Sequence, residues 1–294
     1  MENKILGLFF ILGVTISISS FFFPKTENIS DPAATAKLSF IQELFQGIET
    51  TFQEIKTILK SSSSSNSTPS SFPQNPSDED PNDIFSRGIA EYEKKNYQKA
   101  VEEYSHYLEK VPGDSAGYYN RGLAYYYSDR YLEAMADFEK VVELNPKDAG
   151  AYLYKGYSAE QLKDCMQAIE DFQKAIDLGE DHSEVYGHKA RCENMEENHE
   201  QALKDALKAV SLDKKNTNAI FEVGFAQYAL KKYSDSVVSY NRVLQLDPKD
   251  EIALHNRGLA YVFLKKTALG CKDFQKSLDL GYEDSKMKLK QYCK

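Results

Sequence analysis

The residues that come nearest to a metal site are His188 and Cys192, an imidazole and a thiol four residues apart on one predicted helix. Two such ligands do not make a zinc site, which needs three or four. Phosphate-binding glycine loops, His-Glu-x-x-His, paired Cys-x-x-Cys motifs and a nucleophile elbow do not occur in the sequence. We therefore predict a protein that is not an enzyme and holds no metal or cofactor; an enzyme with scattered catalytic residues is the alternative.

The elements that position these side chains follow from an internal repeat. The string NRGLAY occurs at 120–125 and again at 256–261, a separation of 136 residues, which is four times 34. A 34-residue frame set on this string has small residues at its eighth and twentieth positions and mostly aromatic residues at its twenty-fourth. The eighth positions are Gly88, Gly122, Gly156, Ala190, Gly224 and Gly258; the twentieth are Ala100, Ala134, Ala168, Ala202, Ser236 and Gly270; the twenty-fourth are Tyr104, Phe138, Phe172, Ala206, Tyr240 and Phe274.

This pattern, with Pro112, Pro146 and Pro248 near the ends of three units, resembles the tetratricopeptide repeat. The resemblance implies an all-α fold in which each unit is two antiparallel helices and the units stack into a right-handed superhelical α-solenoid. Only small side chains fit where the two helices cross, and the aromatic side chain fills the space beside the crossing. We expect six repeats, at 81–114, 115–148, 149–182, 183–216, 217–250 and 251–284, and a polar capping helix at 285–294.

Residues 1–25 contain an uncharged apolar run at 5–23. As a helix with a rise of about 1.5 Å per residue, this run would extend about 28 Å, close to the thickness of the hydrocarbon layer of a bilayer. We predict an uncleaved membrane anchor. The alternative is a secretory signal peptide, because Ser17 and Ser19 form a small-x-small cleavage pattern.

Residues 31–60 are predicted to form an amphipathic helix. Its apolar residues recur every three or four positions, as in a coiled coil; they are Leu38, Ile41, Phe45, Ile48, Phe52, Ile55 and Leu59. We expect the chain to form a homo-oligomer through 34–59; docking of this helix on the membrane surface or on another protein are the alternatives. Residues 61–80 are rich in Ser and Pro and are predicted to be a disordered linker.

The net charge of the chain is −9, with 45 acidic against 36 basic residues. Nucleic-acid binding requires clustered Lys and Arg. We therefore expect no nucleic-acid partner.

The four cysteines can be placed with the repeat frame. In a stack of such repeats, the second helix of one unit faces the first helix of the next, which makes Cys271 and Cys293 neighbours. A disulfide between them would fasten the capping helix to the last repeat. Cys165 and Cys192 also lie on facing helices but about one turn out of step, so a disulfide between them is less favourable. Disulfides persist in oxidising compartments; we expect an extracytoplasmic solenoid, in the envelope or secreted, and a cytosolic protein with four free thiols is the alternative.

In the tetratricopeptide repeat family, the first helices line a concave groove that accepts a peptide or a partner helix, mainly through the second, fifth, ninth and twelfth positions. The partner-binding residues that this resemblance implies are Tyr119, Asn120, Leu123, Tyr126, Leu153, Tyr157, Arg191, Phe221, Phe225, Tyr228 and Asn256. Asn120 and Asn256 resemble part of the carboxylate clamp of some members. The rest of that clamp is missing, so we reject its ligand; the alternative is that both amides only join helices.

The order of anchor, helix, linker and solenoid is similar to that of membrane-anchored bacterial envelope proteins. We therefore predict a membrane-tethered protein-interaction scaffold or assembly factor that binds a peptide segment or a helix of a partner protein. The alternative is a cytosol-facing adaptor that docks on a membrane complex through residues 31–60.

Overall fold

The structure, a computed structural model, describes residues 79–293. The predicted membrane segment at 1–25, the predicted helix at 31–60 and nearly all of the predicted linker at 61–80 lie outside the described residues. Between residues 79 and 293 the chain forms thirteen helices and no strand. None of these helices is long and apolar enough to cross a membrane.

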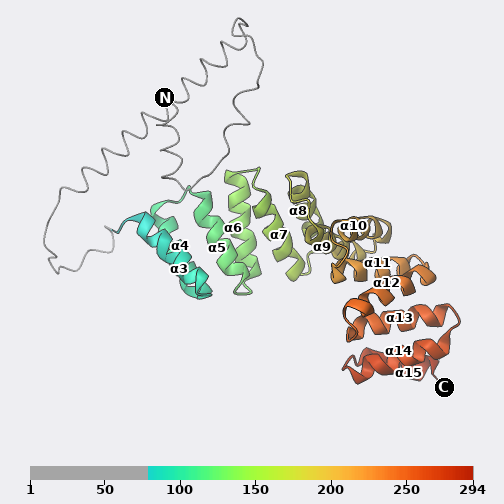
Figure 1. Cartoon of the computed structure of the whole chain (residues 1–294). Helices are drawn as coiled ribbons and strands as arrows, with labels where there is room; N and C mark the ends of the chain where they lie inside the picture. The colour runs from blue at the N-terminus through green and yellow to red at the C-terminus, as the bar shows by residue number, and fades with distance from the viewer. Residues whose placement is uncertain (1–78, 294) are drawn as a thin grey trace, which may run out of the picture. The chain divides into compact units, whose positions relative to one another are not determined.

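Twelve of the helices form six pairs, one in each 34-residue unit, and the pairs follow one another along the array (Figure 1). The first helices are α3 (Pro81–Glu93), α5 (Ser115–Tyr126), α7 (Ala149–Gln161), α9 (Ser183–Met195), α11 (Thr217–Ala229) and α13 (Glu251–Phe263). The second helices are α4 (Tyr97–Lys110), α6 (Tyr131–Leu144), α8 (Cys165–Asp177), α10 (His199–Leu212), α12 (Tyr233–Leu246) and α14 (Thr267–Asp279). A shorter helix, α15 (Asp284–Tyr292), follows the last pair and packs against α14.

The repeat frame also sets where the helices begin and turn. In five units an Asp or Asn precedes the first helix, and its side chain accepts a hydrogen bond from a backbone N–H of the first turn. These residues are Asp80, Asp114, Asp148, Asn216 and Asp250. The turn between the two helices contains one residue with φ between 60° and 66°, always at the fifteenth position: Lys95, Asp129, Lys163, Glu197, Lys231 and Lys265. All six pairs therefore share one turn geometry.

The helix crossings explain the small residues of the frame. A Cβ atom added to Gly156 would lie 2.8 Å from the ring of Phe172, which is fully buried beside the crossing. The fourth repeat departs from this arrangement at both positions, with Ala190 in place of glycine and Ala206 in place of the aromatic residue. The smaller side chain at one position leaves room for the methyl group at the other.

A row of ion pairs joins the two helices of five repeats, from the seventh to the twenty-third position, and was not predicted from the sequence. The pairs are Arg87–Glu103, Arg121–Asp137, Lys155–Asp171, Lys189–Asp205 and Arg257–Asp273. Arg121 and Arg257 each bind both oxygens of their aspartate at 2.7 Å. The fifth repeat has Val223 and Ser239 at these two positions instead.

Lys189 is the most deeply buried cation of the row, with a side chain only 5% exposed. Its Nζ donates to Oε1 of Glu193 at 2.6 Å and also to Oδ2 of Asp205. Burial raises the pKa of Glu193 to about 7, against the opposing effect of the Lys189 hydrogen bond. One cation thus holds two carboxylates inside the fourth repeat.

Replacing Glu193 with glutamine is expected to raise stability at pH 8 and to change it little at pH 5. The folded pKa of Glu193, about 7, lies above its ordinary value of 4.5, so the folded chain binds more protons than the unfolded chain between these values. Stability contributed at this site therefore falls as the pH rises from about 4.5 to about 7, and glutamine removes that loss. The gap in free energy of unfolding between variant and wild type should widen by about 1–3 kcal/mol from pH 5 to pH 8. Urea unfolding followed by circular dichroism at both pH values measures it.

Glu200→Gln, at an exposed site of α10, is the matched control and should leave the pH dependence of the wild type unchanged. Parallel curves for Glu193→Gln and wild type would show that the carboxyl group of Glu193 is not a stability determinant.

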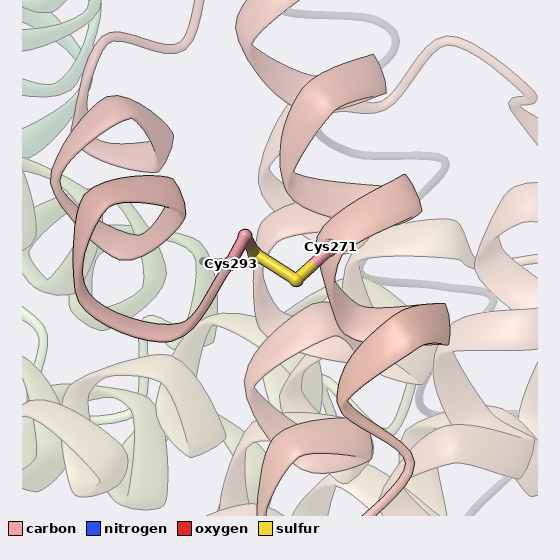
Figure 2. Close-up of a disulfide and its surroundings, with 2 residues drawn as sticks. All are labelled: Cys271 and Cys293. Atoms are coloured by element: carbon pink, nitrogen blue, oxygen red, sulfur yellow. A yellow bond between two sulfur atoms is a disulfide. The ribbon is translucent and has the colours of Figure 1, made fainter.

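Cys271 and Cys293 are joined by a disulfide, with Cα atoms 5.8 Å apart (Figure 2). This is the pair that the repeat frame makes neighbours. Cys271 lies on α14 and Cys293 directly follows α15, so the bond fastens the end of the chain to the sixth repeat.

Cys165 and Cys192 are buried free thiols, so the less favourable disulfide of the sequence analysis is not formed. The thiol of Cys165 instead donates a hydrogen bond to Sδ of Met195 at 3.6 Å. Met195 lies about one turn beyond Cys192 on α9. This displacement agrees with the offset of about one turn expected between Cys165 and Cys192.

Candidate interaction surface

The first helices form one side of the array. Each first helix contacts the first helix of the next repeat, whereas the second helices of neighbouring repeats make no comparable contacts within residues 79–293. Because successive units approach more closely on the side of the first helices, that side is the inner, concave one of the stack. We call it the first-helix face.

Four tyrosines from α5 and α7 gather on this face, and we call them the tyrosine cluster: Tyr119, Tyr126, Tyr154 and Tyr157. The ring centroid of Tyr154 lies 6.3 Å from that of Tyr119, 5.6 Å from that of Tyr126 and 5.9 Å from that of Tyr157. All three contacts are edge-to-face, an arrangement that fixes aromatic rings against one another. The four side chains stay partly exposed, so the cluster presents a preformed aromatic surface.

The hydroxyl groups of the tyrosine cluster are neutral donors. Burial raises the pKa of Tyr119 and of Tyr126 to about 12, and it raises the pKa of Tyr157 as well. Within the described part of the chain, no group hydrogen-bonds to the hydroxyls of Tyr126 or Tyr157. A large apolar ring with an unused donor suits a surface that is wet when empty and contacts a peptide when filled.

A charged cluster follows on α7, α9 and α11; its members are Glu160, His188, Arg191 and Glu222. Arg191 lies between the two carboxylates, 3.3 Å from Oε1 of Glu160 and 3.5 Å from Oε1 of Glu222. Nδ1 of His188 is hydrogen-bonded to Oε2 of Glu160 at 2.7 Å. Burial raises the pKa of Glu222, although hydrogen bonds from Asn194 and Arg191 lower it. These charges are paired within the chain, and Nδ1 of His188, which with Cys192 came nearest to a metal site in the sequence, is hydrogen-bonded to a carboxylate.

A second aromatic group lies on α11 and consists of Phe221, Phe225 and Tyr228. Each of the three side chains is partly exposed. Phe221 packs against the ring of Tyr240 with centroids 5.5 Å apart, and Tyr228 against that of Phe263 at 5.8 Å. The rings are therefore anchored in the repeats and accessible on one side.

The other predicted residues lie elsewhere or serve the fold. Leu153 was predicted to be a partner-binding residue, but the structure buries it. Its side chain is only 8% exposed and packs into the core of its repeat. Leu123 is partly buried and rests against the core of the second repeat. The amide of Asn120 donates to the backbone of its own helix at 2.9 Å, and Asn256 lies against the buried hydroxyl of Tyr240. Neither asparagine forms a clamp.

Tyr154 is the member of the surface that sequence reasoning missed. It occupies the sixth position of its repeat, outside the positions that usually line the groove. Tyr154 nevertheless contacts each of the other three rings of the tyrosine cluster. A comparison of aromatic residues at all first-helix positions would have found it.

Family models match three stretches of the chain. Two matches, at 115–148 and 155–219, are described as tetratricopeptide repeats, and one at 226–262 is described as a TPR repeat. The chain is a tetratricopeptide repeat protein. The first match coincides with the second 34-residue unit, so the tetratricopeptide frame and the frame read from the sequence have the same phase.

Solved structures agree with a tetratricopeptide repeat fold. The crystal structure of YrrB, described as a TPR protein with an unusual peptide-binding site, is 21% identical, with a TM-score of 0.57 over 65% of this chain and 100% of that chain. MamA is 19% identical, with a TM-score of 0.53 over 58% and 94%. A tetratricopeptide repeat protein from Parabacteroides merdae is 18% identical, with a TM-score of 0.61 over 72% and 87%. No curated protein matches. At these identities the likeness concerns the fold.

Proposed function

We propose that this tetratricopeptide repeat chain is a non-enzymatic scaffold or assembly factor whose first-helix face binds a peptide segment or a helix of a partner protein. The observation that carries the proposal is the tyrosine cluster, with its partly exposed rings and the unused hydroxyl donors of Tyr126 and Tyr157. Tyrosine is among the residues that contribute most to binding at protein interfaces. The likeness of the fold to YrrB, whose description names a peptide-binding site, supports the same function.

The order of groups along the first-helix face suggests what the partner segment carries. A segment that crosses from α5 to α11 meets the tyrosine cluster first, then the charged cluster, then Phe221, Phe225 and Tyr228. Apolar side chains near its two ends and polar side chains in its middle would match this order.

The chain is also proposed to be tethered to the membrane through 1–25 and to self-associate through 34–59, with its repeats outside the cytoplasm. The uncharged apolar run at 5–23 supports the tether. The disulfide between Cys271 and Cys293 supports an oxidising compartment.

Replacing Tyr126 and Phe225 together with alanine is expected to reduce partner capture at least tenfold. The double variant removes one ring from each aromatic region of the first-helix face, and loss of two interface rings costs several kcal/mol at a well-packed contact. Capture is measured by pull-down with the purified chain as bait and quantified by mass spectrometry. Helical circular dichroism should be unchanged.

Leu132→Ala with Val238→Ala is the matched control. These side chains are 69% and 66% exposed on the second helices α6 and α12, so the control removes apolar surface from the opposite side of the same repeats. Capture that survives in the Tyr126 and Phe225 variant but is lost in the control would move the binding site to the second helices and overturn the proposal.

A further inference from the structure

Three sulfur atoms come together between α8 and α9. Cys165 is the first residue of α8, and Cys192 and Met195 lie about one turn apart on α9. Sγ of Cys165 is 3.6 Å from Sδ of Met195, and Cys165 and Cys192 belong to one buried cluster of packed side chains. Both thiols are buried, whereas Met195 is 51% exposed, so the group reaches solvent through its thioether. We call these three residues the sulfur cluster.

The sulfur cluster stands where two other junctions between repeats hold stacked aromatic rings. Those rings pair the seventeenth position of one repeat with the thirteenth of the next: Tyr97 with Tyr127, centroids 5.7 Å apart, and Tyr233 with Phe263, 4.9 Å apart. At the junction of the third and fourth repeats the same two positions are Cys165 and Met195. Cys192 adds a third sulfur at the tenth position, where the other repeats have alanine or serine. Ordinary packing of the repeat is thus replaced by sulfur at three positions of one junction.

The surroundings contain charges of both signs. Burial and the carboxylates of Glu160 and Glu196 raise the pKa of the Cys165 thiol, and Lys163 lowers it. Burial raises the pKa of the Cys192 thiol, and Arg191 lowers it. Cys165 also lies at the N-terminus of α8, where the helix dipole favours a negative sulfur. Lys163, Arg191 and the N-terminus of α8 thus place positive charge near the two thiols.

We propose that the sulfur cluster binds one Cu(I) ion through Cys165, Cys192 and Met195. Thiolate and thioether sulfur are the soft ligands that select Cu(I). With metal–sulfur bonds of about 2.3 Å, three sulfurs around one ion lie about 4 Å apart, so the 3.6 Å between Cys165 and Met195 needs only a small outward shift. On binding, each thiol releases its proton to solvent and copper stays Cu(I), so no oxidant or reductant is consumed.

Zinc fits this cluster less well. Structural Zn(II) takes four nitrogen, sulfur or oxygen ligands. Within residues 79–293 no three His, Cys, Asp or Glu side chains are placed to hold a metal together. The third ligand of the sulfur cluster is a thioether, which suits a soft monovalent ion better than zinc.

The test is an anaerobic titration of the purified chain with Cu(I) in ascorbate, which leaves disulfides intact, with bicinchoninate as a coloured competing chelator. One Cu(I) per chain should be withheld from the chelator. Replacing Cys165 and Cys192 together with serine should weaken binding at least 100-fold, and Met195→Leu about tenfold. X-ray absorption at the copper edge should report sulfur ligands alone. Met166→Leu, which alters a 62% exposed thioether next to Cys165 in sequence, is the control and should bind like the wild type.

Met195→Leu changes a half-exposed side chain and keeps both buried thiols, so its result is independent of any folding defect in the serine variant. Three outcomes would overturn the site. They are complete transfer of copper from the wild type to the chelator, wild-type affinity in both the serine and leucine variants, and tighter retention of Zn(II) than of Cu(I).

Discussion

Replacing Lys189 with methionine is expected to lower the free energy of unfolding by about 3–5 kcal/mol at pH 8. The methionine has a similar length, but it leaves Glu193 and Asp205 without the cation that both contact. The two carboxylates are only 2% and 6% exposed, so water cannot replace the lost partner. Urea unfolding followed by circular dichroism measures the loss, and hydrogen exchange should place it in α9 and α10.

Lys140→Met is the matched control, because Lys140 pairs with Glu143 on the surface of α6 with side chains 44% and 55% exposed. A surface pair of this kind contributes about 0.2–1 kcal/mol. The second test is the double variant Lys189→Met with Glu193→Gln, which should regain part of the lost stability because one of the two unpaired charges is gone. If Lys189→Met and Lys140→Met cost the same, the buried ion pairs do not stabilise the fourth repeat.

Replacing Cys271 and Cys293 together with serine is expected to destabilise the end of the array by about 3 kcal/mol. The disulfide spans 22 residues, and closing a loop of this size removes about that much conformational entropy from the unfolded chain. In a repeat array each unit contacts only its neighbours, so the loss should stay local. Hydrogen exchange should become faster in α14 and α15 and stay unchanged in α3 to α8. Faster exchange throughout residues 79–293 would contradict the local effect.

The same two cysteines report the compartment of the repeats. Labelling of intact cells with a membrane-impermeant maleimide, before and after reduction, should modify Cys271 and Cys293 only after reduction. Labelling that requires cell lysis instead would place the repeats on the cytoplasmic side and favour an adaptor that docks through residues 31–60.

The helices could be predicted because the repeat constrains them at many positions at once. Gly156 fits against Phe172 only where two helices cross closely, so a small residue and an aromatic one sixteen positions later fix both helices of a unit. The ion pairs between the seventh and twenty-third positions have the same period and could have been found in the sequence. They were missed because Arg or Lys and Asp or Glu on a helix also fit an ordinary solvated surface.

The interaction surface was less predictable, because position in the repeat does not determine exposure. Leu153 and Tyr119 share the fifth position, yet only Tyr119 has a side chain long enough to leave the core and meet Tyr154. The contact between Cys165 and Met195 joins two units, and its formation depends on side-chain directions that spacing alone does not give. Residues that recur in every unit were therefore predicted well, and residues peculiar to one junction were not.

The bond between Cys271 and Cys293 also sets how far the chain can lengthen under tension. A fully stretched chain gains about 3.4 Å per residue, so the sequence separation of 22 between the two cysteines represents about 75 Å of contour length. While the bond is closed, a force applied to the two ends of the chain passes through the sulfur atoms and bypasses that segment. After reduction, unfolding of α14 and α15 alone would release this length, without unfolding of the other repeats.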